Sequence, residues 1–178
     1  LAVSEDEMKQ AQRYDVAAFL EAHSESVEVK AVERLLEISA QLGVHLHFCH
    51  MTTEEGLNAI VEAKKSGRAV TCEVTPNHLL LSSADVERYG QLVIMMPPLR
   101  SKTNIEALWK GITNGWIDVL GSDHAPHTLK EKSASSVWDV KVGIPGLETT
   151  LPLLLSMVKK AKLSITHVIR LLAEKPAD

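Results

Sequence analysis

The chain has 178 residues, a formal net charge of -4, and a composition that is 45% hydrophobic and 24% charged, which suits one soluble globular domain with a hydrophobic core. No basic stripe suggests a nucleic-acid partner, and no apolar run approaches the roughly 18 residues that cross a bilayer. The two cysteines, Cys49 and Cys72, lie in apolar runs. They favour buried reduced thiols and a cytoplasmic location.

The first third of the chain predicts mostly helix. Residues 6–22 are polar with loosely helical spacing. Apolar residues at helical spacing then predict a longer helix that ends at Gly43. A short strand is expected over residues 45–50. Residues 52–55 match a capping box, which opens a helix that ends at Gly67.

The remainder of the chain alternates strands and helices. Residues 69–74 predict a second strand, and the apolar run 92–96 predicts a third, which stops at two prolines. Residues 103–106 are expected to cap another helix, and residues 119–122 predict the last strand. Two more helices are expected at the C-terminal end, over about 147–160 and 165–174.

Alternating strands and helices with short links predict an α/β fold with a parallel sheet and right-handed crossovers. The residues able to do chemistry fall at the carboxyl ends of the predicted strands, where barrel and doubly wound enzymes place their sites. A closed eight-stranded barrel needs about 250 residues. Three or four strands therefore predict part of a (β/α)8 TIM-type barrel, and the family resemblance described below implies that it is the C-terminal portion.

Two clusters carry the chemistry. The segment Asp123-His124-Ala125-Pro126-His127 follows the last strand and places a carboxylate beside two imidazoles, the groups from which hydrolytic metal sites are built. His45, His47 and His50 lie on the first strand. His50, at the strand end, is the natural ligand, whereas His45 and His47 are interpreted as packed strand histidines.

Other residues carry weaker signals. Glu73 is either a hydrogen-bonded interior carboxylate or a site residue. Cys49 is expected in the core rather than on a metal, because zinc thiolates usually come in spaced pairs. His78 is expected to be structural, and His23 is expected to face solvent. The composition of residues 130–138 predicts a mobile loop, either a lid or a surface loop.

Five motifs occur in the order seen in dihydroorotases, which belong to the cyclic amidohydrolase branch of the amidohydrolase superfamily. The motifs are H-F-C-H-M-T-T at 47–53, T-C-E-V-T-P-N-H-L-L-L at 71–81, M-P-P-L-R at 96–100, D-H-A-P-H at 123–127 and G-I-P-G-L-E-T at 143–149. The chain resembles this family from about Gly43 to its end. The last two motifs separate dihydroorotases from hydantoinases and allantoinases.

The resemblance implies reversible hydrolysis of dihydroorotate to N-carbamoyl-aspartate in pyrimidine synthesis, with two zinc ions per complete site. It implies that His50 and Asp123 are metal ligands and that Asp123 is also the catalytic acid–base. His127 would bind substrate near its carboxylate, and the loop Ile144-Pro145-Gly146 would contact the pyrimidine ring. The implied partners are this small-molecule substrate and either further copies of the chain or other enzymes of the pyrimidine pathway.

The chain departs from the family in several places. The H-x-H-x-R strand, the bridging lysine or aspartate and the H-x-E-D histidine are absent, and Met96 stands where the family often has an asparagine, so it cannot donate that hydrogen bond. Residues 1–178 are therefore expected to be a partial barrel, without its N-terminal strands and C-terminal small β domain. Alone, it is expected to be inactive and to bind zinc weakly or not at all. Two alternatives stay open: a catalytically inactive dihydroorotase-like structural or partner subunit, and another cyclic amidase of the hydantoinase or allantoinase type.

Overall fold

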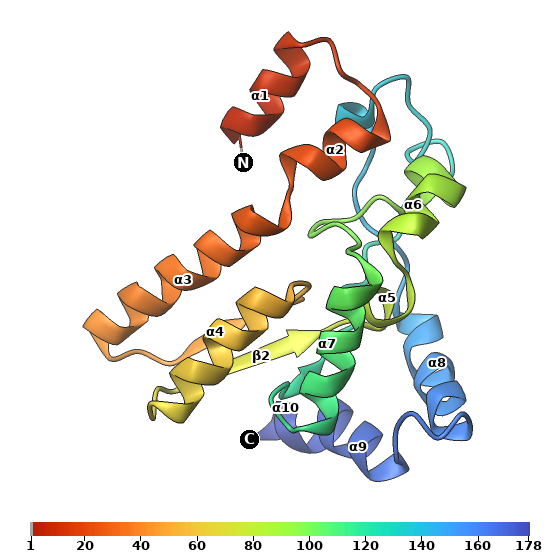
Figure 1. The fold of residues 1–178 in the computed structure, drawn as a ribbon. Coiled ribbons are helices and arrows are strands. Elements are labelled where there is room, and N and C mark those ends of the chain that lie inside the picture. The colour runs from red at the N-terminus through yellow and green to blue at the C-terminus, as the bar shows by residue number, and fades with distance from the viewer. Residues whose placement is uncertain (1) are drawn as a thin grey trace.

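The structure, a computed structural model, describes residues 2–178. Its sheet is parallel and three-stranded, in the order β1 (Leu46–Phe48), β2 (Val70–Val74) and β3 (Val119–Leu120). The helices, shown in Figure 1, are α1 (Ala2–Gln10), α2 (Val16–Ala22), α3 (Glu25–Leu42), α4 (Glu54–Lys65), α5 (Pro76–Leu80), α6 (Ser83–Tyr89), α7 (Lys102–Thr113), α8 (Leu147–Lys159), α9 (Ile165–Ile169) and α10 (Lys175–Ala177). Short 3-10 helices cover Gly90–Val93 and Val137–Asp139, and a π-helical turn, Arg170–Glu174, joins α9 to α10.

Each pair of neighbouring strands is joined through helices, as parallel pairing requires. In Figure 1, α3 lies alongside α4, α4 and α7 flank β2, and α8, α9 and α10 gather at the C-terminal end of the chain. The predicted α/β architecture with a parallel sheet is confirmed. Within residues 2–178, every helix is too short or too polar to traverse a lipid bilayer.

The core lies between the sheet and the helices that pack on it. Along β2 the side chains alternate: Val70, Cys72 and Val74 are buried, whereas Thr71 and Glu73 on the other face are half-buried. The apolar face of β2 therefore packs against helices, and its polar face carries the side chains that lead to the site described below.

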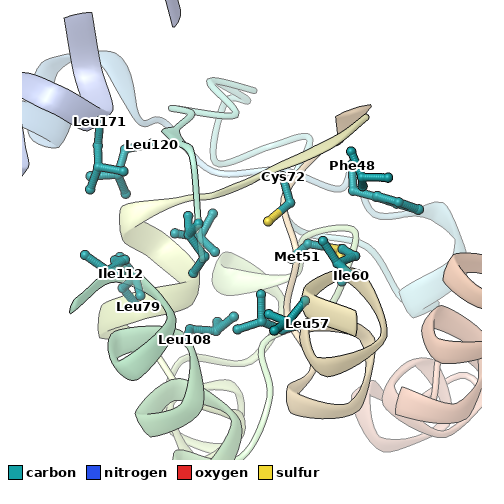
Figure 2. Close-up of a cluster of buried hydrophobic side chains, with 14 of the residues drawn as sticks. Phe48, Met51, Leu57, Ile60, Cys72, Leu79, Leu108, Ile112, Leu120 and Leu171 are labelled. Carbon is teal, nitrogen blue, oxygen red and sulfur yellow. The ribbon is translucent and has the colours of Figure 1, made fainter. Parts of the chain in front are cut away.

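Helices α4 and α7 supply most of the partners of that apolar face. Leu57 and Ile60 of α4, together with Leu108 and Ile112 of α7, are buried in one cluster with Cys72. Figure 2 shows these side chains filling the space between the strands and the helices. Their i, i+3 and i, i+4 spacing on each helix is the pattern that the sequence presented.

A second apolar cluster lies under the loops, and it explains one wrong prediction. The run 92–96 is not a strand, because its first residues form the 3-10 helix and Ile94 and Met95 are buried in this cluster. The run is apolar because it packs under loops rather than in the sheet. The cluster comprises Phe19, Val86, Ile94, Met95, Leu99, Val137 and Val140.

Both predicted helix caps are displaced. Helix α4 begins after Thr53, whose hydroxyl accepts from the amide of Gly56; a glycine at that position has no side chain to complete a capping box. Helix α7 begins after Ser101, two residues before the predicted cap. Asn104 instead accepts from the amide of Glu54, so it caps the start of the neighbouring helix α4.

Two predictions of exposure are reversed. His23 is buried rather than solvent-facing, because its ring hydrogen-bonds the carbonyl of Phe19 at 2.8 Å and the carboxylate of Glu5 at 3.1 Å. Cys49 is exposed rather than buried. Strand β1 ends at Phe48, so Cys49 lies in the turn that follows and not in the sheet.

Replacing Leu57 by alanine tests the main core. Leu57 is 1% exposed, and we expect Leu57→Ala to lower the free energy of unfolding by about 2–5 kcal/mol, because it leaves a cavity between α4 and α7. The matched control is Leu42→Ala at a leucine that is 68% exposed, with an expected change within about 0.5 kcal/mol. Equal losses in chemical denaturation would contradict this description of the core.

Candidate active site

His50 and Asp123 follow the carboxyl ends of β1 and β3. Both have positive φ, 40° for His50 and 44° for Asp123, a conformation that side-chain-bearing residues rarely adopt. Such a residue costs about 1–3 kcal/mol and persists only where its surroundings fix it, often at functional sites. The two residues predicted from motifs to ligate metal therefore share an uncommon backbone geometry.

The carboxylate of Glu73 reaches both strand ends. Its Oε1 accepts from the backbone amide of His50 at 3.3 Å, and it would lie 2.6 Å from a Cβ placed on Gly121. Its Oε2 lies 3.7 Å from Nε2 of His47. Because β2 lies between β1 and β3, Glu73 spans the distance from one strand end to the other. Glu73 is thus a hydrogen-bonded carboxylate, which is one of the two interpretations that the sequence left open.

The pKa of Cys49, the residue before His50, is affected by carboxylates near these strand ends. Although Cys49 is exposed, partial desolvation by the surrounding protein raises the pKa of its thiol above the ordinary value, and the carboxylates of Glu73 and Asp123 raise it further. Asp123 follows β3 and His50 follows β1, so both come after the carboxyl ends of strands in one parallel sheet. His50 and Asp123 belong to the same end of the sheet, as the sequence predicted.

One polar atom of the His50 imidazole is left unsatisfied by the described residues. Its Nδ1 is buried and has no hydrogen-bond partner among residues 2–178, and leaving a buried polar atom unpaired is costly. His50 also lines a cavity of about 270 Å³ together with Met96, Pro97, Glu28 and Arg100. The structure thus brings Met96 beside His50.

A buried ion pair holds the loop that carries His50. Glu28, on α3, accepts from the amides of Thr52 and Thr53 at 2.9 and 3.0 Å and from both of their hydroxyls. Arg100 pairs with Glu28 at 3.4 Å and also donates to the hydroxyl of Thr52 at 3.0 Å and to the carbonyl of His23 at 2.7 Å. The carboxylate of Glu28 therefore fixes both Thr52 and Thr53, which follow the His50 turn.

His78 is structural, in keeping with its prediction. The ring donates to the carbonyl of Pro97 at 3.0 Å, which places the proton on Nε2, and Nδ1 accepts from the hydroxyl of Thr75 at 2.9 Å. Burial lowers the pKa of His78 to about 4, so the ring is neutral at pH 7. It connects the end of β2 to the segment that contains Met96.

The loop after Asp123 is joined to the loop that precedes α8. Nδ1 of His124 accepts from the amides of Gly146 and Leu147 at 3.0 and 3.1 Å, and the amide of Ala125 donates to the carbonyl of Ile144 at 3.2 Å. His124 also forms an isolated parallel bridge with Ile144. The D-H-A-P-H and G-I-P-G segments thus form one unit beside the sheet end.

Close backbone approach makes two glycines necessary in this unit. A Cβ on Gly146 would lie 2.3 Å from the carbonyl oxygen of Ser122. Gly143 has φ of 129°, and a Cβ there would lie 2.4 Å from that of Ala125. His127, half-buried on the same loop, hydrogen-bonds the carbonyl of Val142 at 3.1 Å.

The donor set fits part of a metal site. His50 offers a buried ring nitrogen that has no partner among residues 2–178, and Asp123 offers a hard oxygen donor on the loop after β3, two strands away in the sheet. Residues 2–178 contain no group of three or more histidine, cysteine, aspartate or glutamate side chains arranged to hold an ion. The described residues therefore do not form a complete metal site by themselves, although His50 and Asp123 are each of a type that zinc binds.

Sequence reasoning missed Glu28 and the supporting role of His124. Glu28 lies in the polar part of a helix, where a carboxylate is normally solvated, and its partners are more than twenty positions away in sequence. His124 could have been singled out as a member of the D-H-A-P-H motif. Its function as an acceptor at the start of α8 depends on a contact that no local pattern indicates.

Comparison with known proteins defines the class. The chain is 34% identical to the L-hydantoinase (dihydropyrimidinase) from Arthrobacter aurescens, with a TM-score of 0.92 over 99% of this chain and 40% of that one. It superposes on the D-hydantoinase from a Thermus species with a TM-score of 0.95 at 25% identity, again over 99% of this chain and 40% of that one. No protein-family model matches the chain. Fold and sequence identity define a cyclic amidohydrolase.

Sequence relatives narrow the class further. The chain is 43% identical to the dihydroorotase of Halobacterium salinarum over 93% of its length, and 40% identical to that of Geobacillus thermodenitrificans over 94%. It belongs to the dihydroorotase family. It spans 38% of the length of each of these two relatives. An inactive dihydroorotase-like domain of a CAD-like multifunctional protein from Chaetomium thermophilum is more distant, with a TM-score of 0.63 at 27% identity over 80% of this chain and 38% of that one.

Removing the charge of Glu28 tests the clamp on the His50 loop. We expect Glu28→Gln to lower the free energy of unfolding by about 3–5 kcal/mol, because it leaves the buried guanidinium of Arg100 without its counter-charge. Chemical denaturation provides the measurement. Glu33→Gln, at an exposed glutamate of the same helix, is the control and should change stability by less than about 0.5 kcal/mol. Indistinguishable denaturation curves for the two variants would show that the clamp does not stabilise the fold.

The pH dependence of stability tests the environment of His78. Its pKa is lowered from 6.5 to about 4 in the folded protein, so the unfolded chain binds the proton first as pH falls. Stability should therefore be complete above pH 6.5 and decline by about 3 kcal/mol as pH falls toward 4. Carboxylates also titrate in this window, so the measured quantity is the difference between the wild type and His78→Gln, which lacks the titrating ring. Parallel stability–pH curves for the two proteins would refute a buried neutral imidazole.

Proposed function

We propose that the complete protein carrying this chain is a dihydroorotase that reversibly hydrolyses dihydroorotate to N-carbamoyl-aspartate in pyrimidine synthesis. The observation that carries the proposal is the meeting of His50 and Asp123 at one sheet end, both with positive φ, in a member of the dihydroorotase family. The G-I-P-G segment tied to the D-H-A-P-H loop supports the same reading.

The three strands are proposed to be the C-terminal portion of a (β/α)8 barrel. The parallel order β1-β2-β3 and the superposition of this chain on 40% of a hydantoinase support this placement. The remaining strands, and a small β domain, would belong to parts of the protein outside residues 1–178. Thr71 and Glu73, on the half-buried face of β2, would then point into the barrel.

The proposed cofactor is zinc, two ions in a complete site. His50 and Asp123 would be this chain's ligands, and the others would come from the rest of the barrel. Bound zinc makes hydroxide available at neutral pH by lowering the pKa of water to about 7. Glu73, which bonds the His50 amide, would keep that strand end in position.

Asp123 is proposed to carry the proton. Its carboxylate accepts a proton from the attacking water as the oxygen adds to the ring carbonyl carbon. It then returns that proton to the amide nitrogen as the carbon–nitrogen bond breaks, and the new carboxyl group of N-carbamoyl-aspartate releases its remaining proton to solvent. The same group serves as base and then acid, so the reverse reaction uses the same steps.

The substrate is proposed to lie against the loop unit after β3. His127 would bind near the substrate carboxylate, and the backbone at Ile144-Pro145-Gly146 would contact the ring. Met96 would contribute only an apolar contact, because its thioether donates no hydrogen bond. The close approach of Gly146 to Ser122 supports this arrangement, since it sets the position of the loop.

The proposed setting is the cytoplasm, with the small-molecule substrate as the main partner and neither nucleic acid nor membrane bound. Association with further copies of the chain or with other enzymes of the pyrimidine pathway is also proposed. The likeness to a domain of a CAD-like multifunctional protein supports the second association.

Asp123→Asn in the complete, zinc-loaded protein tests the function. Asparagine keeps the size of the side chain but cannot accept the proton, and we expect the turnover of dihydroorotate to fall by about 10²–10⁴-fold or more. Asp6→Asn, at an exposed aspartate of α1, is the control and should leave turnover unchanged. Circular dichroism should show that both variants fold. Retention of most of the wild-type rate by Asp123→Asn would show that Asp123 is not the base.

The wild type in the same assay separates the two alternatives. Hydrolysis of hydantoin or dihydrouracil, with no turnover of dihydroorotate, would identify another cyclic amidase. No turnover of any of these substrates by the zinc-loaded protein would identify an inactive dihydroorotase-like subunit. The match to an inactive dihydroorotase-like domain and the methionine at position 96 are the observations in favour of that last outcome.

A further inference from the structure

Lys132 is buried in the loop that was predicted to be mobile. It is 5% exposed, and its ammonium group donates to three backbone carbonyls, those of Ile94 at 2.7 Å, Lys141 at 3.0 Å and Gly143 at 3.0 Å. An ammonium group has three N–H donors. All of them are used, each toward a different residue.

The three carbonyls, not a counter-ion, compensate the buried charge. Burial lowers the pKa of Lys132, and within residues 2–178 the polar partners of its ammonium group are these backbone carbonyls rather than a carboxylate. A lysine is almost never fully buried unless its charge is satisfied. An apolar side chain at position 132 would fill the same space without the cost of burying a charge. The presence of a lysine there indicates that its three hydrogen-bond donors are needed.

The bonded carbonyls belong to the two segments proposed to face the substrate. Ile94 lies two residues before Met96, and Gly143 directly precedes Ile144. The amide of Gly143 also donates to the carbonyl of Ile94 at 2.9 Å, so one backbone bond and two ammonium bonds converge on these segments. Ile94 and Gly143 lie 49 positions apart in sequence, and neither belongs to a strand of the sheet.

The loop that carries Lys132 is itself fixed at its far side. The amide of Val137 donates to the carbonyl of Tyr14, and the indole of Trp138 donates to that of Arg13, both at 2.9 Å. Figure 1 shows this segment, in cyan, beside α2 and near α6. Hydrogen bonds therefore tie this loop to the rest of the chain at Lys132 and again at Val137 and Trp138.

We propose that Lys132 is a positioning residue that joins the segment before Met96 to the segment before Ile144 into one rigid wall of the substrate site. It sets the affinity for substrate without touching it, and it takes no part in the proton transfer assigned to Asp123. This inference rests on the proposed function for its kinetic consequence. The tie between the two segments stands on geometry alone.

Lys132→Met in the complete, zinc-loaded protein is the test, because methionine keeps an unbranched chain out to the ε position and removes the ammonium group with its donors. We expect KM for dihydroorotate to rise about tenfold or more while kcat stays within about threefold of the wild type, since the loss falls on substrate binding. In native-state hydrogen exchange, the amide of Gly143 should exchange at least about tenfold faster, because its strand-like tie to Ile94 is no longer braced.

Two further variants make the result specific. Lys132→Arg restores charge and donors and should recover most of the wild-type KM and of the protection at Gly143. Lys130→Met removes an exposed lysine of the same loop and should change neither quantity. If Lys132→Met does not fold, Lys132→Gln, which keeps two donors, is measured with the same expectation of a raised KM and faster exchange.

Three results would overturn the inference: unchanged KM and unchanged exchange in the folded Lys132 variant, a fall in kcat as large as the rise in KM, or equal effects in Lys130→Met. Failure of the proposed function has a different signature. The wild type would then not turn over dihydroorotate at all, and the exchange of Gly143 would still decide whether Lys132 ties the two segments.

Discussion

The carboxylate of Glu73 is the contact on which the arrangement of the site depends. It sits on the central strand, accepts from the amide of His50 after one neighbouring strand, and fills the space beside Gly121 on the other. A side chain on Gly121 would displace it. The parallel order of three short strands brings their carboxyl ends together. Glu73 then contacts the loop after β1 through the His50 amide and lies against Gly121 at the start of the loop after β3.

Around this contact, buried charges support the loops. The His50 turn is fixed by Glu28, which uses both oxygens on Thr52 and Thr53 and is neutralised by Arg100. The loop after β3 is braced by Lys132 through backbone carbonyls. Positive φ at His50 and Asp123 is costly, and it persists here because the surrounding network fixes both turns. The hydrogen bonds of this network thus maintain the unfavourable backbone conformation at His50 and Asp123, the residues proposed to carry the reaction.

Local patterns predicted the features that depend on local physics. The strand containing Val70, Cys72 and Val74 and the helix that ends at Gly43, with φ of 65°, follow from side-chain alternation and from the freedom of glycine. The strand ends also located His50 and Asp123. What sequence could not indicate were long-range partners: Asn104 caps a helix fifty positions earlier, and Lys132 bonds a carbonyl thirty-eight positions away. The apolar run at Ile94 was wrongly predicted to be a strand for the same reason. Burial under loops and burial in a sheet both produce a continuous run of apolar residues.

The account rests on His50 and Asp123 acting together at one sheet end. The most direct measurement is a crystal structure of the complete protein with zinc located by its anomalous scattering. The account predicts zinc within about 2.0–2.2 Å of a ring nitrogen of His50 and of a carboxylate oxygen of Asp123. Zinc held by other residues, with the side chains of His50 and Asp123 turned away from it, would contradict the account.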